Sequence, residues 1–201
     1  MNKEILTLCQ VLLLFSCGEL IFAHWTSSGY PDLRGRTVTK CGVEISPGTL
    51  LYVCDPDHVL NSSQARSLND QLHKLAVGTP CHCQRRSQCA TGEDVNSPFH
   101  GFVASVALVN NLQMTIHNRA EGFCRTLEGR WALGDCGNSV LIFVWKHYKK
   151  MIIWPARLAH RYVTAGERRR ILDDVNTLVQ NDKWYEALTR VIGTRYKNSA
   201  G

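Results

Sequence analysis

The feature that most constrains the fold of this chain is the run SVLIFVWK, residues 139–146. Its apolar residues are continuous and do not alternate with polar ones, which is typical of a strand that is buried on both faces. This run is therefore predicted to form a central strand. The segment KKMIIW, residues 149–154, follows after a short turn and is predicted to be its hairpin partner.

Apolar spacing predicts the elements around this strand. Residues 49–54 and 102–110 have the short apolar composition of strands. Four helices are predicted, with inward residues Ala65, Leu68, Leu72 and Leu75 in the first; Ile116, Ala120, Phe123, Leu127 and Trp131 in the second; Ile171, Leu172, Val175, Leu178 and Val179 in the third; and Trp184, Leu188, Val191 and Ile192 in the fourth. The order of these elements predicts an α/β fold in which helices cover a mixed sheet.

Residues that start helices support two of these predictions. Asn61, with Gln64 three residues later, predicts a capped helix over about 62–76. Thr164 and Glu167 form the same pattern at the start of the third helix. A helix that begins at a defined residue has a defined register, so the inward residues named above are expected to share one face.

The chain divides into one main domain and flanking segments. Residues 1–23 are predicted to be a signal peptide, and residues 24–49, rich in Gly, Pro, Ser and Thr, are predicted to be an extended lead-in. Residues 50–196 are expected to form the domain, within which 77–101 is a Cys-rich loop insertion, and 197–201 form a tail.

The signal peptide prediction rests on Lys3, on the apolar run ILTLCQVLLLF and on the small residue Ala23 at the end of the segment. An uncleaved anchor is the alternative, but Glu19 interrupts the run before it reaches the roughly 20 apolar residues that span a bilayer. No later segment is apolar enough to cross a membrane, and the last residues lack a lipid-anchor tail. The product is expected to be secreted, with no membrane span in this chain.

Secretion makes disulfide bonds the expected state of the cysteines. Removal of the signal peptide takes away Cys9 and Cys17, and the disulfide candidates that stay are Cys41, Cys54, Cys81, Cys83, Cys89, Cys124 and Cys136. Because this number is odd, one thiol is either free or bonded to another chain. We expect Cys124 to pair with Cys136, and the insertion to be joined to the lead-in through Cys41 or Cys54.

The charge of +6 is moderately basic, with clusters at 146–150 (KHYKK) and 167–170 (ERRR). Such clusters suit anionic lipid, an acidic protein surface or nucleic acid, but most are simply solvated surface. Export excludes nucleic acid as a partner. Neither G-x-S-x-G nor a Cys–His protease signature occurs, so nucleophilic catalysis is not predicted.

The blocks RWALGDCGNSVLIFV and LVQNDKWYEAL, in the element order β-α-β-α-β-β-α-α, look like a TPM domain. More narrowly, CGVEISPGTLLYVCDPDHVLN, CHC and LGDCGNSVLIF resemble the invertebrate modulator of levamisole receptor family, over about residues 30–196. The resemblance implies an α-β-α sandwich and an extracellular, non-enzymatic partner of nicotinic acetylcholine receptors that increases their response. Members studied as receptor partners carry a transmembrane segment after the domain, so this chain is expected to be soluble or to reach the cell surface through a partner.

The wider TPM resemblance implies a second function. Some TPM domains bind calcium or act as weak acid phosphatases, which would make Asp55, Asp57 and Asp135 ligands of a divalent cation. However, the loop at 154–162 carries Arg157, His160 and Arg161 where the wider family has an acidic residue, which disfavours calcium. The preferred interpretation is that the aspartates accept hydrogen bonds in turns and that no cofactor is present.

Two further sites remain as expectations. The sequon NSS at residues 61–63 predicts a glycan on Asn61, which leaves the side-chain oxygen free to cap the helix. The segment CHCQRRSQC has the residue types of a zinc site, with His82 or His100 as the fourth ligand. One residue between Cys81 and Cys83 is less than the usual two to four, so disulfides are favoured over zinc.

Overall fold

The protein folds around one mixed four-stranded sheet, whose strand order is β2-β3-β5-β6. A computed structural model describes residues 24–44, 49–89, 101–113 and 120–198. The strands are β2 (Val53–Cys54), β3 (Val103–Val109), β5 (Ser139–Trp145) and β6 (Lys150–Pro155), of which the first three are parallel and β6 is antiparallel to β5. Every residue of β5 is buried between its two neighbours, so the predicted central strand and its hairpin partner are confirmed.

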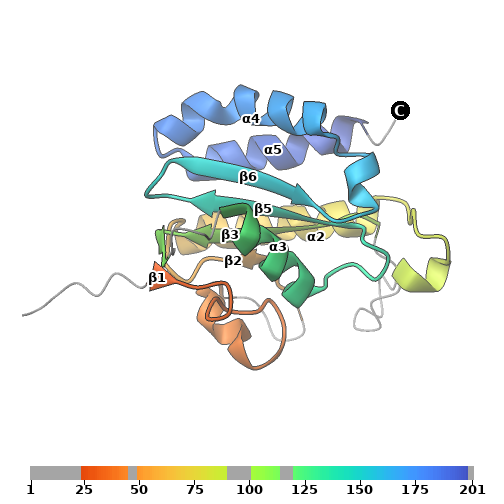
Figure 1. Ribbon diagram of the computed structural model, residues 1–201, viewed down its shortest axis with the longest axis horizontal. Coiled ribbons are helices and arrows are strands. Elements are labelled where there is room, and N and C mark those ends of the chain that lie inside the picture. Colours follow the sequence, from red (N-terminus) through yellow and green to blue (C-terminus); the bar gives the residue numbers. More distant parts are fainter. Residues whose placement is uncertain (1–23, 45–48, 90–100, 114–119, 199–201) are drawn as a thin grey trace, which may run out of the picture.

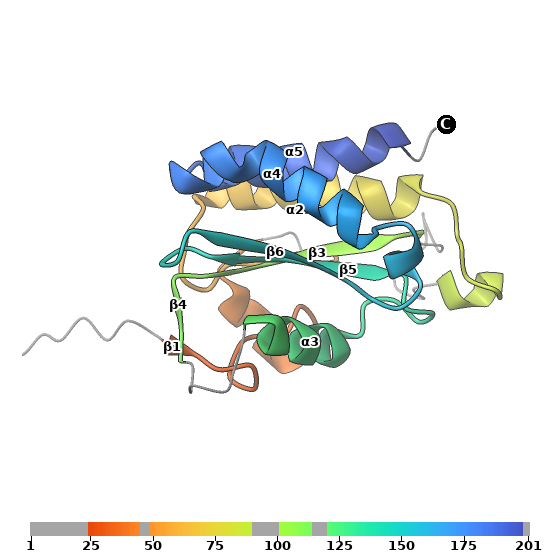
Figure 2. The ribbon, with the colours of Figure 1, turned by 45° about the horizontal axis from the view of Figure 1, so that its top comes forward.

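Helices cover both faces of the sheet (Figures 1 and 2). One face carries α2 (Ser62–Gly78), α4 (Ala165–Gln180) and α5 (Trp184–Asn198). The other carries α3 (Ala120–Trp131) and η1 (Gly35–Cys41), a 3₁₀ helix of the lead-in. The predicted α/β fold with a mixed sheet between helices is thus confirmed. The inward residues named above that lie in the described segments are buried or packed against the core, whereas Ile116 lies outside those segments.

The predicted capping box is confirmed at Asn61, and at Thr164 the structure shows its first bond, from the Glu167 N–H to the Thr164 side chain. The Asn61 side-chain oxygen accepts from the Gln64 N–H at 2.9 Å, and the Gln64 side chain accepts from the Asn61 N–H at 3.2 Å. Thr164 accepts from the Glu167 N–H at 3.3 Å, while the Glu167 carboxylate contacts Arg170. These caps satisfy N–H groups that the first turn of a helix leaves without partners.

The predicted strand at 49–54 is wrong in its first part, because only Val53–Cys54 pairs with β3. The buried Asn69 of α2 takes the place of a neighbouring strand there. Its amide oxygen accepts from the Tyr52 N–H at 2.7 Å and its amide nitrogen donates to the Leu50 carbonyl at 3.1 Å. A helix side chain therefore satisfies backbone groups of residues 50–52 that would otherwise need a partner strand.

The prediction of an extended lead-in is also wrong, because this segment folds onto the sheet. His24–Trp25 (β1) pairs in parallel with Asn111–Leu112 (β4), and η1 follows. The buried Tyr30 hydroxyl lies 2.8 Å from the Cys54 carbonyl oxygen and 2.9 Å from that of Leu108, so it joins the ends of β2 and β3. Side-chain hydrogen bonds to backbone groups hold the segment, and such bonds leave no periodic pattern in a sequence.

Arg130 and Trp131, at the end of α3, hold the lead-in from the other side. The Arg130 guanidinium donates to Asp32 at 2.7 Å and to the carbonyl oxygens of Ser27 and Tyr30. The Trp131 indole N–H donates to the Pro31 carbonyl at 3.1 Å. Together they tie the lead-in to α3 on that face of the sheet.

Candidate functional site

The chemistry-bearing residues gather at the two ends of the sheet. The parallel strands β2 and β3 both end beside the turn that contains Asp55 and Asp57, which we call the carboxyl-end turn (residues 53–61). The loop before β5 and the segment after β6 meet at the opposite end, because β6 runs antiparallel and Val140 pairs with Pro155. We call that end the amino end.

Asp55 is a buried structural acceptor in the carboxyl-end turn. Its two carboxylate oxygens accept from the backbone N–H groups of Val59 and Leu60, each at 2.8 Å. Burial raises the pKa of Asp55 to about 6, although these hydrogen bonds and the nearby His58 act in the opposite direction. Asp55 is thus an acceptor within its own turn, as predicted, but its N–H donors lie four and five residues along the chain rather than one or two.

The lead-in approaches this turn closely at Gly42. The Asp55 N–H donates to the Cys41 carbonyl at 2.8 Å, and the disulfide Cys41–Cys54 joins the same two segments. Gly42 has a φ of 66°, and a Cβ atom there would lie 2.6 Å from the Asp55 carbonyl oxygen. Glycine is therefore required for the lead-in to lie against the turn.

Asp57 holds two distant segments rather than its own turn. One carboxylate oxygen accepts from the Trp25 indole N–H at 2.9 Å, and the other accepts from the Asn110 backbone N–H at 2.6 Å. It thereby joins β1 and the end of β3 to the carboxyl-end turn. The prediction of hydrogen bonds to nearby backbone groups is wrong for Asp57, since its partners come from β1 and from the boundary between β3 and β4.

Asp135 lies at the other end of the sheet. It is exposed in the turn before β5, where the Gly137 N–H donates to the Gly134 carbonyl at 3.2 Å. The seven residues of β3 span about 20 Å at about 3.3 Å per residue, and they separate Asp135 from the carboxyl-end turn. The structure does not bring the three aspartates together, so they do not form one cation site.

The cysteine pairing corrects two predictions. Cys41 pairs with Cys54, so neither joins the insertion to the lead-in. Cys136 pairs with Cys83 of the insertion rather than with Cys124. Cys124 is buried in α3, seven residues and about 10 Å before the end of the helix, and Cys136 lies beyond that end. The Cα atoms of a disulfide lie within about 7 Å of each other, so this separation does not suit a Cys124–Cys136 bond.

Cys124 is the free thiol among the described residues. Burial raises its pKa to about 12, and the nearby Glu121 acts in the same direction. A buried thiol in this state is unreactive and does not bond to another chain. Of the two fates expected for the odd cysteine, the structure shows the free one.

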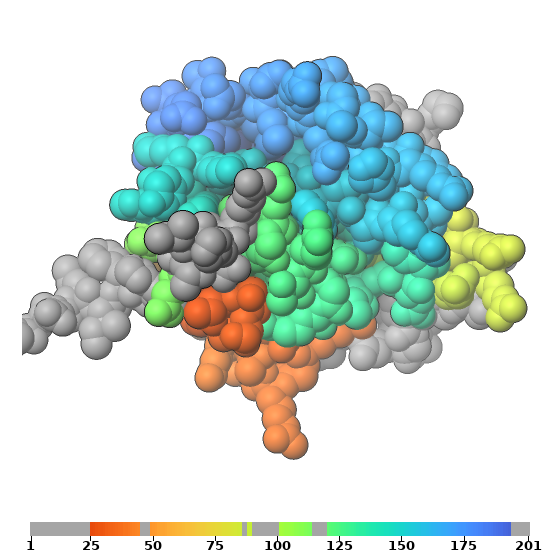
Figure 3. Space-filling view, viewed as in Figure 1, coloured from red at the N-terminus to blue at the C-terminus, as the bar shows by residue number. Residues whose placement is uncertain are grey.

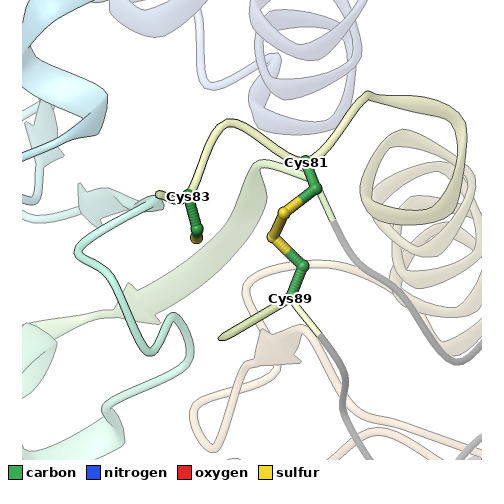
Figure 4. Close-up of side chains that lie close together, drawn as sticks. All are labelled: Cys81, Cys83 and Cys89. Carbon is green, nitrogen blue, oxygen red and sulfur yellow. A yellow bond between two sulfur atoms is a disulfide. The ribbon is translucent and has the colours of Figure 1, made fainter. Parts of the chain in front are cut away.

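The disulfides Cys81–Cys89 and Cys83–Cys136 consume the thiolates that a zinc site in the insertion would need. Figure 4 shows Cys81 and Cys89 joined directly, with Cys83 beside them. The sulfur atoms of Cys81, Cys83 and Cys89 lie within 4.8 Å of one another, and all three are in disulfides. His82 contacts Tyr162, and His100 lies outside the described residues.

A cleft of about 600 Å³ opens at the amino end, between the insertion, the loop before β5 and the segment after β6. In Figure 3 these three segments lie side by side at the right-hand end of the molecule. The residues that line this cleft, which we call the basic cleft, are His82, Gln84, Gln88, Asp135, Cys136, Gly137, Arg157, Leu158 and Arg161. Within the part of the chain that the structure describes, neither Arg157 nor Arg161 has an ion-pair partner.

An aromatic rim borders the basic cleft. The Tyr162 ring is 51% exposed, and its centroid lies 4.8 Å from that of His82 and 5.0 Å from that of Phe102. The Tyr162 hydroxyl lies 3.3 Å from His82 Nδ1. The sequence shows the basic residues at 154–162, which argue against calcium. It gives no reason to place His82 beside them, because His82 reaches the cleft through the neighbouring disulfide Cys83–Cys136, which was not predicted.

Asn61 is exposed at the start of α2, so the predicted glycan has space there. This site belongs to the carboxyl-end turn and lies at the opposite end of α2 from the insertion. Glycosylation itself stays a prediction, as does cleavage of the leader, since residues 1–23 lie outside the described segments. Among the helices that the structure describes, none has the length and apolar character needed to cross a bilayer.

Comparison with known proteins identifies one family. A family model described as "Modulator of levamisole receptor-1" matches residues 25–149, more than half of the chain. A search of the curated proteins finds no match. One similar solved structure is the N-terminal domain of a protein from P. gingivalis, determined by solution NMR. Its TM-score is 0.48 at 15% identity, and the match covers 68% of this chain and 73% of that one.

Proposed function

The chain belongs to the modulator of levamisole receptor-1 family, and on this basis we propose that it is an extracellular, non-enzymatic auxiliary protein of a levamisole-type nicotinic acetylcholine receptor. In this proposal it binds the receptor and increases its response to agonist. The family match over residues 25–149 is the observation that supports the proposal, because it includes the carboxyl-end turn, the insertion and β5.

An extracellular location is part of the proposal. The predicted signal peptide would direct export, and the three disulfides among the described residues suit an oxidising compartment. A glycan on Asn61 would cover the start of α2 and leave the amino end accessible. Mass spectrometry of protein purified from culture medium tests both points, through a mature N-terminus near residue 24 and an added glycan mass on the Asn61 peptide.

We further propose that the protein acts without a metal cofactor. The four carboxylate oxygens of Asp55 and Asp57 accept from N–H donors, so they already have partners that a cation would have to displace. Asp135 is on the other end of the sheet and cannot complete such a site. Calorimetric titration with calcium is expected to show no saturable heat, and a phosphate-ester assay no turnover above that of a heat-denatured sample.

The decisive experiment measures receptor currents. Levamisole-type receptor subunits are expressed in oocytes with and without the protein, and peak current is recorded over a range of agonist concentrations. We expect a larger peak current or a lower half-maximal agonist concentration with the protein present, together with co-purification of receptor and protein. Unchanged currents and no co-purification across the subunit combinations would reject the proposal.

A matched control guards against effects of expression. The same export signal is placed on an unrelated disulfide-bonded protein of similar size, and surface receptor is quantified by labelling in each case. An increase in current that follows only the amount of surface receptor would show assistance with assembly or transport rather than modulation of gating.

A further inference from the structure

The basic cleft combines a defined shape with two arginines that no carboxylate of the described residues pairs with, and we propose that it binds a carboxylate-bearing peptide segment of the partner protein. This inference rests on the proposed function in one respect, namely that the segment belongs to an extracellular loop of the receptor. The recognised chemistry is a glutamate or aspartate side chain that accepts hydrogen bonds from guanidinium groups.

The charge of the cleft favours an anion. Arg157 and Arg161 are exposed, both line the cleft, and no described carboxylate pairs with either. His82 adds an imidazole to the same wall, and Asp135 is the one carboxylate among the described residues that line the cleft. The two guanidinium groups carry two positive charges and Asp135 carries one negative charge, so one ligand carboxylate would bring the sum of these charges to zero.

The walls of the cleft are fixed before any ligand binds. The Gly137 carbonyl accepts from the N–H groups of Leu158 and Ala159, at 2.9 Å and 3.0 Å, which holds the segment after β6 against the loop before β5. The disulfide Cys83–Cys136 attaches the insertion to the same loop. Gly137 has a φ of 75°, and a Cβ atom there would lie 3.3 Å from the backbone nitrogen of Arg157. Preorganised walls reduce the entropy lost on binding.

The lining favours a peptide over a dense polyanion such as a sulfated glycan. Asp135 repels continuous negative charge but accepts a peptide N–H or a cationic side chain. The Gln84 and Gln88 amides line the same cleft and offer both donors and acceptors to a peptide backbone. The exposed ring of Tyr162 provides an aromatic surface for a residue next to the carboxylate.

The test uses the secreted, disulfide-bonded protein and needs no receptor. The probe is a fluorescent decapeptide in which glutamate alternates with tyrosine, and its binding is followed by anisotropy. Two double variants carry the same change of net charge: Arg157→Glu with Arg161→Glu in the cleft, and Arg34→Glu with Arg36→Glu on the exposed part of the lead-in. We expect the cleft variant to bind about tenfold more weakly than wild type and the lead-in variant within about twofold.

Further probes separate the possible outcomes. Replacing each glutamate of the peptide by glutamine is expected to abolish binding, and equal thermal midpoints would show that both variants are folded. Equal weakening in the two variants, or no saturable binding of the glutamate peptide, would overturn the inference. Heparin that displaces the peptide and binds more tightly, with the same dependence on Arg157 and Arg161, would assign the cleft to a glycan and also overturn it.

The receptor assay distinguishes failure of this inference from failure of the proposed function. If the protein increases the currents, the cleft variant is expected to lose the increase while the lead-in variant retains it. Peptide binding that depends on the cleft, with no effect of the protein on currents, would leave the cleft as a peptide site and reject the receptor as its partner. Increased currents with both variants would reject the cleft as the receptor contact.

Discussion

The two ends of the sheet contain polar residues of opposite charge that are used in different ways. At the carboxyl-end turn, the oxygens of Asp55 and Asp57 accept from N–H donors of the protein, so these side chains serve the fold as hydrogen-bond acceptors. At the amino end, Arg157 and Arg161 lie exposed in the basic cleft, with no described ion-pair partner. A polar group that is fully hydrogen-bonded inside the protein stabilises it, whereas an exposed one with open bonding capacity is available to a ligand.

The ends also differ in what holds them together. Hydrogen bonds and one disulfide, Cys41–Cys54, close the carboxyl-end turn. At the amino end, the disulfide Cys83–Cys136 attaches the insertion to the loop before β5, and Cys81–Cys89 closes a loop within the insertion. The insertion has one short 3₁₀ helix, η2 (Arg86–Cys89), among its described residues. Because such a segment buries few apolar side chains, its position relative to the cleft depends on covalent bonds.

The largest expected effect comes from removing the bond between the insertion and the loop before β5. Replacing Cys83 and Cys136 by serine opens a loop with a sequence separation of 53, and chain entropy predicts a loss of about 4 kcal/mol in the free energy of unfolding. Removal of Cys81–Cys89, with a separation of 8, is the matched control and is expected to cost about 2.5 kcal/mol. Urea unfolding measures both, and a reversed order would contradict this account of the amino end.

The next largest effect is expected at the carboxyl-end turn. Asp55→Ala removes the acceptor of two buried N–H groups and is expected to lower the free energy of unfolding by about 3 kcal/mol. Asp135→Ala, which removes an exposed aspartate at the other end, is expected to change it by less than about 0.5 kcal/mol. Similar values for the two variants, measured by urea unfolding at pH 4, where the contribution of Asp55 is fully present, would show that the two ends do not differ in this way.

The pH dependence of stability sharpens the same comparison. Burial raises the pKa of Asp55 to about 6 in the folded protein, whereas an aspartate in an unfolded chain has a pKa of about 4. Between these values the folded state holds a proton that the unfolded state releases. The contribution of Asp55 is therefore fully present below pH 4 and is lost as pH rises through 6, by up to about 3 kcal/mol.

Asp55→Asn isolates that contribution, because asparagine does not titrate. The difference in unfolding free energy between wild type and Asp55→Asn is expected to change between pH 4 and pH 6 and to stay constant above pH 7. Urea unfolding at several pH values measures it. A difference that is constant over the whole range would show that Asp55 does not titrate there.

The smallest expected effect concerns the cations of the basic cleft. Arg157→Ala with Arg161→Ala is expected to change the free energy of unfolding by less than about 0.5 kcal/mol, because neither side chain is buried or paired within the described segments. Thermal and urea unfolding provide the measurement. A loss above 2 kcal/mol would mean that these arginines serve the fold, as Asp55 does.

Much of the fold could be predicted from local patterns. The uninterrupted run at 139–145 indicated a strand buried on both faces, and the caps at Asn61 and Thr164 indicated where two helices begin. The lead-in could not be predicted in this way. Its contacts with the sheet come from single side chains, such as Tyr30 and Arg130, whose partners are distant in the sequence.

The candidate site was less accessible to prediction. The motif at 53–61 places two aspartates beside a cysteine, an arrangement that suits a cation site, yet each aspartate accepts hydrogen bonds from N–H groups of the protein. The cations at 157 and 161 were visible in the sequence, but their neighbours in the cleft come from the insertion, more than 60 residues earlier. Cysteine spacing does not determine pairing, so nothing in the sequence joined these two segments.

The sequence by itself determined the class of the fold, the central strand, the helix starts and the family. The first three depend on hydrophobic period and capping, which act between residues close together in the chain, whereas the family was indicated by the resemblance of motifs such as LGDCGNSVLIF. Only the tertiary structure decided the cysteine pairs, the docking of the lead-in and the assembly of the basic cleft. Those features depend on which side chains, distant in the sequence, come into contact once the sheet has formed. The register of β3, β5 and β6 determines these contacts.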